Sequence, residues 1–130
     1  FDPTDPDGNL GRDRQDLRIS ELKKMFDVIA KENHTDAKFF VRTWLLNIDA
    51  FTRLFPEKFS GTSILWPEKK TIDNAHWGQF VDRRGNLKKD LADKLLSNVK
   101  NNFHEDVNLY FPLPARYAEM TVKELIEYYV

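Results

Sequence analysis

The chain has 130 residues, the length of one ordinary domain. Hydrophobic residues make up 41% and aromatic residues 13%, which excludes a disordered chain too poor in apolar surface to fold. Its 20 basic and 21 acidic residues leave a net charge of −1, so bulk charge does not favour non-specific nucleic-acid binding. The absence of cysteine excludes disulfides, cysteine-ligated metals and thiol nucleophiles.

The N-terminal segment is rich in proline, aspartate and glycine, which favour turns and extended backbone over helix. We predict an extended acidic arm over residues 1–15 and a single helical domain over residues 16–130. No apolar run approaches the roughly 18 residues of a membrane-spanning helix, and no signal peptide is recognisable, so a soluble protein is expected. The sequence does not specify a compartment.

Two long amphipathic helices are predicted in the first half of the chain. Apolar residues recur at helical spacing over residues 16–32, with Asp16 as the N-cap. Residues 35–55 carry a broader apolar face, which predicts a helix buried at the centre of the core and ended by Pro56. The main residues of that face are Phe40, Trp44, Ile48, Phe51 and Phe55.

The second half alternates loops with shorter elements. Residues 56–70 are predicted to form a loop, with at most a short extended piece, and residues 71–83 a short helix. Leucines four residues apart predict a helix over residues 86–103, and alternation over 107–111 indicates one short strand. Thr121 and Glu124 form a capping box that begins a last helix. The expected fold is therefore mainly α, a compact bundle of four to five helices with an extended N-terminal arm and at most one short strand element.

No motif predicts a catalytic, cofactor or metal site. The acidic segment before Gly8 fails the spacing of a calcium-binding EF-hand loop. His34, His76 and His104 show no zinc-ligand spacing, and no serine lies in a G-x-S-x-G turn. Residues distant in sequence can still meet in a fold, so catalysis stays open, but the sequence favours a non-catalytic role without cofactors.

The segment Asp2-Pro3-Thr4-Asp5-Pro6-Asp7-Gly8-Asn9 resembles the D-P-x-D-P-x-x-N segment of template-independent nucleotidyltransferases. That family includes archaeal CCA-adding enzymes and oligoadenylate synthetases. The resemblance covers about eight residues. The family's Gly-Ser turn with a magnesium-binding Asp-x-Asp pair has no counterpart here, because Gly61-Thr62-Ser63 leads only to Asp73. The resemblance therefore implies an excised part that lacks the catalytic centre.

Charge is unevenly distributed along the chain. Both ends are acidic, and basic pairs gather in the middle, at residues 69–70, 83–84 and 88–89. Three interpretations remain: solvated surface, a site for an acidic protein, and a site for nucleic acid, which has weaker support. Trp66, beside Pro67, is either a core residue or an interface anchor. The residues predicted to bind a partner are Arg83, Arg84, Lys88, Lys89 and Trp66.

These features favour a non-catalytic protein-interaction or assembly module, a subunit of a larger complex with a protein partner of acidic character. The alternative is an excised non-catalytic part of a nucleotidyltransferase or of another enzyme.

Overall fold

The computed structural model describes residues 8–32, 34–67 and 74–129. Two predictions fall outside these ranges: most of the segment that resembles nucleotidyltransferases, and the Lys69–Lys70 pair. The first residues of the helix predicted from position 71 also lie outside them.

Three strands of the described chain form an antiparallel sheet in the order β1-β3-β2. β1 spans Lys38–Thr43, β2 spans Ile64–Leu65 and β3 spans Arg116–Thr121. β1 pairs with β3 along its whole length, and β2 pairs with the first residues of β3. The strand that comes last in the chain is therefore the central one.

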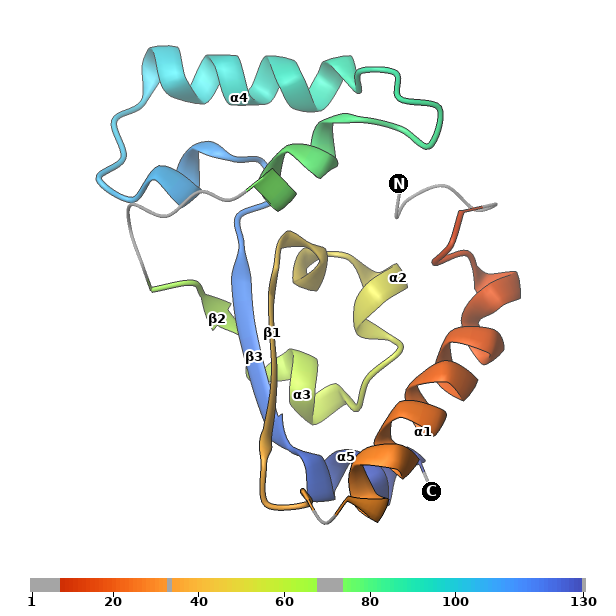
Figure 1. Cartoon of the computed structure of the whole chain (residues 1–130). Coiled ribbons are helices and arrows are strands. Elements are labelled where there is room, and N and C mark those ends of the chain that lie inside the picture. The colour runs from red at the N-terminus through yellow and green to blue at the C-terminus, as the bar shows by residue number, and fades with distance from the viewer. Residues whose placement is uncertain (1–7, 33, 68–73, 130) are drawn as a thin grey trace.

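Four α-helices lie on one side of this sheet (Figure 1): α1 (Gln15–Lys31), α2 (Asp49–Thr52), α3 (Glu57–Gly61) and α5 (Val122–Tyr129). No helix among the described residues covers the other side. Short 3-10 helices, η1 (Arg12–Arg14) and η2 (Trp44–Asn47), precede α1 and follow β1. The predicted helical bundle with at most one short strand is therefore wrong, because the helices pack on a three-stranded sheet.

The helix predicted over residues 35–55 is the main error. The structure places β1, η2 and α2 there. The predicted face rested on Phe40, Trp44 and Ile48, and a spacing of four residues fits a strand of period two as well as a helix. Exposure alternates along β1: Phe39 and Val41 pack against the core, while Phe40 is exposed. Only the remote strand β3 resolves the ambiguity, because it supplies the hydrogen-bond partners of β1.

The core between the sheet and its helices is aromatic. Phe26 of α1 lies 5.3 Å from Phe39 of β1 and 5.6 Å from Tyr129 of α5, measured between ring centroids. Phe59 of α3 lies 5.9 Å from Phe39 and 4.8 Å from Phe55. Phe26 and Phe59 are fully buried. These rings join each covering helix to the inner face of the sheet.

A second group of elements lies beyond one end of the sheet (Figure 1): η3 (Asn74–Phe80), α4 (Lys89–Asn101) and η4 (Val107–Tyr110). α4 confirms most of the helix predicted over 86–103. The strand predicted over 107–111 is wrong, because residues 107–110 form a 3-10 helix. The Asp106 side chain accepts a hydrogen bond from the Asn108 amide and caps that helix.

Two buried amides fasten this end group to the segment that enters β3. The Asn108 side chain donates to the Ala115 carbonyl (2.9 Å) and accepts from the Ala115 N–H (2.6 Å). The Gln79 side chain makes the same pair of bonds with Leu113, at 3.2 and 3.0 Å. Both amides are completely buried. Together with the Trp66 N–H, which also donates to the Ala115 carbonyl, they satisfy buried backbone groups that would otherwise be costly.

Two predicted helices are confirmed in position. α1 occupies Gln15–Lys31, within one residue of its predicted limits. The predicted N-cap is wrong, because Arg14 occupies that position and Asp16 lies inside the first turn, where its charge suits the helix dipole. The capping box at the start of α5 is present: the Thr121 amide donates to the Glu124 carboxylate, and the Glu124 amide donates to Thr121 Oγ1. Lys58 of α3 also contacts this carboxylate at 2.5 Å, and Lys58 and Thr121 together lower the Glu124 pKa to about 2.

Leu10, at the end of the predicted arm, packs in the core and is only 9% exposed. Arg53 also donates a hydrogen bond to its carbonyl oxygen, at 2.7 Å. We predict that Leu10→Ala lowers the free energy of unfolding by about 2–5 kcal/mol, as for other buried leucines. Leu17→Ala is the matched control, since Leu17 is half exposed on α1. Equal denaturation midpoints for the two variants would show that Leu10 does not pack on the body.

Asn108→Asp tests the fastening of the end group to β3. Aspartate has nearly the same shape as asparagine but cannot donate to the Ala115 carbonyl, and it places a carboxylate where a neutral amide is buried. The Ala115 carbonyl keeps the hydrogen bond from the Trp66 N–H, so the expected loss of about 1–3 kcal/mol arises from the lost Asn108 hydrogen bond and from the carboxylate buried beside that carbonyl. Urea denaturation measures it. Asn9→Asp, an exposed replacement of the same kind, should leave the midpoint nearly unchanged.

Candidate functional site

The outer face of the sheet carries a cluster of aromatic side chains, of which Phe40 is exposed and Tyr117 and Trp66 are partly buried. Antiparallel pairing places Arg42 of β1 opposite Tyr117 of β3 and Phe40 opposite Glu119, and residues two apart on a strand share a face, so Phe40 lies diagonally beside Tyr117. Ile64 of β2 pairs with Tyr117 and extends the same surface. Trp66 follows β2 and continues its pairing by donating its amide hydrogen to the Ala115 carbonyl at 3.1 Å. We call these five residues the outer sheet face.

The rings of the outer sheet face lie side by side. Phe40 and Tyr117 are 5.8 Å apart between centroids and only 29° from parallel. Trp66 lies 5.7 Å from Tyr117, and the Arg42 guanidinium carbon lies 5.0 Å from the Trp66 centroid. Phe40 is 60% exposed and Ile64 56%. The result is a row of three π surfaces, with Phe40 exposed, Tyr117 and Trp66 partly buried, and one cation against Trp66.

A small polar network borders this row. The Glu119 carboxylate accepts a hydrogen bond from the Tyr117 hydroxyl and pairs with Lys38 at 3.1 Å. The Tyr117 hydroxyl and then Lys38 lower the Glu119 pKa, whereas the carboxylate raises the Tyr117 pKa. Glu119 therefore remains ionised, and Tyr117 remains a neutral phenol held in one orientation.

The four predicted basic residues lie at a tight turn that leads into α4. Val81 and Leu87 form an isolated antiparallel bridge across the turn, and Gly85 has φ of 82°, a conformation that favours glycine. The amides of Arg84 and Asn86 donate to the Asp82 carboxylate at 2.8 and 2.9 Å. The hydrogen bond from the backbone N–H of Asn86 is the main cause of the lowered Asp82 pKa. Asp82 thus holds the backbone of the turn that carries the exposed Arg83 and Arg84 side chains.

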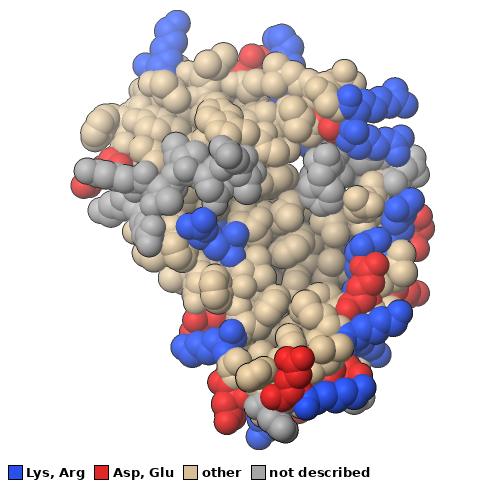
Figure 2. All heavy atoms as spheres, in the orientation of Figure 1, with Lys and Arg blue, Asp and Glu red and all other residues tan. Residues whose placement is uncertain are grey.

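The structure does not bring the predicted partner-binding residues into one site. Arg83, Arg84, Lys88 and Lys89 are close together, and Lys89 pairs with Asp93 at 3.1 Å. In Figure 1 this turn and the end of β2, which Trp66 follows, lie on opposite sides of the molecule. In Figure 2, Lys and Arg gather around the end occupied by α4, whereas along α1 they alternate with Asp and Glu.

α4 has an apolar side that no described element covers. Its inner side faces the end group through Asn98, which donates to the Tyr110 carbonyl at 3.1 Å. None of its residues is buried. Leu96 is 65% exposed, Val99 59%, and Phe103, just beyond the helix, 88%.

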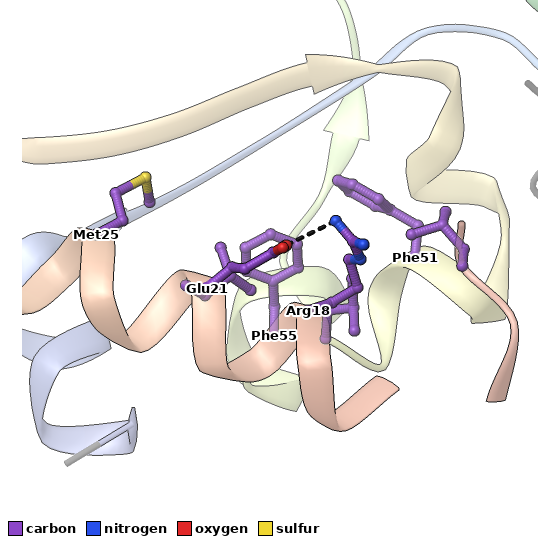
Figure 3. Close-up of a pocket in the computed structure, with 8 residues that line it drawn as sticks. Arg18, Glu21, Met25, Phe51 and Phe55 are labelled. Carbon is purple, nitrogen blue, oxygen red and sulfur yellow. Dashed lines mark hydrogen bonds and ion pairs between the residues drawn. The ribbon is translucent and has the colours of Figure 1, made fainter. Parts of the chain in front are cut away.

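A cavity of about 290 Å³ opens between α1 and the segment around α2 (Figure 3). Its lining is mostly apolar and includes Met25, Phe51 and Phe55, with the Arg18–Glu21 ion pair (2.6 Å) beside it. This lining suits an apolar group. It contains no histidine, serine or tyrosine that could act as nucleophile or general base.

The described residues give little support to a metal site, to a catalytic histidine or to a membrane-spanning helix. No group of three His, Asp or Glu side chains there is placed to hold a metal ion. His76 is buried, and its Nε2 lies 3.2 Å from Asn108 Oδ1, so it belongs to the network that fastens the end group. None of the described helices combines the length and the apolar character that crossing a membrane requires.

Sequence reasoning missed the outer sheet face, although it identified Trp66. The available signal was the run of aromatic and β-branched residues in Lys38–Thr43, which favours a strand but was interpreted as part of a helix. Comparison of the chain with protein-family models, curated proteins and solved structures finds no match.

The polar network gives a test of the geometry of the outer sheet face. Tyr117→Phe removes the donor that most lowers the Glu119 pKa, so this pKa should rise toward its ordinary value while Lys38 still holds it down. Because a lowered carboxylate pKa stabilises the fold above the unfolded-state pKa, that contribution disappears as pH falls through the folded-state pKa. The variant should therefore lose less stability on acidification. Carboxyl-carbon NMR titration measures the pKa; an unchanged value would contradict the Tyr117–Glu119 contact.

Proposed function

We propose that this chain is a non-catalytic interaction module of a larger complex, with one surface for a nucleic-acid strand and another for a protein partner. The observation that carries the proposal is the outer sheet face, a row of one exposed and two partly buried rings on a sheet that helices cover on one side only.

The rings favour unpaired nucleobases as ligands. Every base offers a π face, and exposed aromatic side chains on a sheet are a recurring platform on which single-stranded bases stack. Phe40 and Tyr117 are nearly parallel, so they offer neighbouring surfaces of similar tilt. Trp66 extends the row by a third ring.

The charges of the outer sheet face fit a polyanion at moderate strength. Arg42 lies against Trp66 and supplies a cation near the rings. Lys38 is largely offset by Glu119. We therefore assign most of the binding free energy to stacking and a smaller, salt-dependent part to phosphate contacts.

The alternative function, a non-catalytic part of a template-independent nucleotidyltransferase, makes use of the same surface. Such a part would hold the strand that another domain extends. Attaching a catalytic domain and testing whether Phe40→Ala impairs nucleotide addition would separate the two readings. A separate assembly subunit would show no such dependence.

The direct test is fluorescence anisotropy with a labelled oligouridylate of about 12 nucleotides, within the site sizes usual for single-strand binders. Phe40→Ala should weaken binding by about 5- to 150-fold, the cost of one lost base-stacking contact. Arg42→Gln should weaken it less and lower the salt slope by about one.

Phe103→Ala is the matched control, since Phe103 is an exposed phenylalanine that follows α4 and is not part of the outer sheet face. It should bind the oligonucleotide like the unaltered chain. Equal affinity for the Phe40→Ala protein and the unaltered chain, or no binding by either, would refute the nucleic-acid proposal.

A further inference from the structure

The exposed side of α4 offers a second and chemically different surface. Ala92, Leu96 and Val99 follow one another at helical spacing, so they lie along one face of the helix. We call these three residues the α4 stripe. Leu96 and Val99 are more than half exposed, and Phe103 follows just beyond the end of the helix.

This surface differs from the outer sheet face in its side chains. The α4 stripe is aliphatic and offers no π surface to a base. An aliphatic ridge on a helix is the surface that an amphipathic helix of another protein covers with its own apolar face. Exposed apolar surface of this kind marks interaction sites in folded proteins.

The charge around the α4 stripe specifies the partner. Residues 81–103 carry six Lys or Arg and three Asp, a net charge of +3 in a chain whose total is −1. Lys100 stands one turn after Leu96 and borders the α4 stripe, whereas Lys89, two turns before Leu96, is paired with Asp93 at 3.1 Å. Lys100 forms no ion pair with a described residue. At the start of the helix, the turn held by Asp82 adds Arg83 and Arg84.

From this arrangement we propose that the α4 stripe and the basic turn before it bind an acidic amphipathic helix of a partner protein. The apolar side of that helix would cover Leu96 and Val99, and its acidic flanks would face Lys100 and Arg84. The inference rests on the protein-binding half of the proposed function and names the partner by its chemistry. It does not depend on nucleic-acid binding, which uses the other surface.

The test uses the whole chain and a synthetic amphipathic helical peptide of about 18 residues, with leucines along one face and glutamates elsewhere. A second peptide, identical except for lysine in place of glutamate, is the control for charge. Isothermal titration calorimetry should show binding of the glutamate peptide that weakens as salt rises, and no binding of the lysine peptide.

Variants separate the two parts of the surface. Leu96→Ala should weaken binding of the glutamate peptide by roughly tenfold or more, as for a central interface residue. Arg84→Glu combined with Lys100→Glu should weaken it and flatten its salt dependence. Leu17→Ala, an exposed leucine on α1, and Phe40→Ala should leave peptide binding unchanged. Circular dichroism confirms that each variant is folded.

Three outcomes would overturn this inference. The first is that the chain does not bind the glutamate peptide. The second is that it binds phosphatidylserine vesicles through Leu96 in place of the peptide. The third is that sedimentation shows a dimer that Leu96→Ala abolishes. Loss of oligonucleotide binding in Phe40→Ala with intact peptide binding would support both surfaces independently. Peptide binding without oligonucleotide binding would leave this inference standing and refute only the nucleic-acid half of the proposed function.

Discussion

The antiparallel pairing of β1 with β3 is the constraint on which the rest of the structure depends. It joins residues 38–43 to residues 116–121 and so closes the chain on itself. Because side chains alternate along paired strands, this register sends Phe39, Val41, Ala118 and Met120 into the core. The same register turns Phe40 and Tyr117 outward. A shift of one residue would reverse both sets, so one register determines which residues form the core and which form the outer sheet face.

The helices cover only one side of the sheet, and this asymmetry produces the candidate site. α1 and α5 pack against each other and close the aromatic core around Phe26 and Tyr129. Their side of the sheet has ring-to-ring packing that excludes water. On the opposite side Phe40 is exposed and Tyr117 and Trp66 are only partly buried, so these rings contribute less to the core. The core and the candidate binding surface therefore lie on opposite faces of the same three strands.

The end group also has one packed side and one open side. Buried amides of Gln79 and Asn108 hold the backbone before β3, so α4 is supported from one side without being enclosed. Its outer side is aliphatic and edged by lysines, whereas the outer sheet face is aromatic with an arginine. The two surfaces therefore suit the different ligands that we propose for them. Each can consequently be altered without disturbing the other.

The sequence by itself determined the elements whose signals are local. The stripe of α1, the leucine spacing of α4, and the capping box of Thr121 and Glu124 depend on residues within a few turns of one another. The basic turn was visible for the same reason, and its role in binding stays a prediction. Only the tertiary structure decided that Lys38–Thr43 is a strand, because a four-residue spacing satisfies both helical and extended periods and the deciding partner lies at the far end of the chain. The aromatic row followed from that decision, since its rings come from three segments that only the folded sheet brings together.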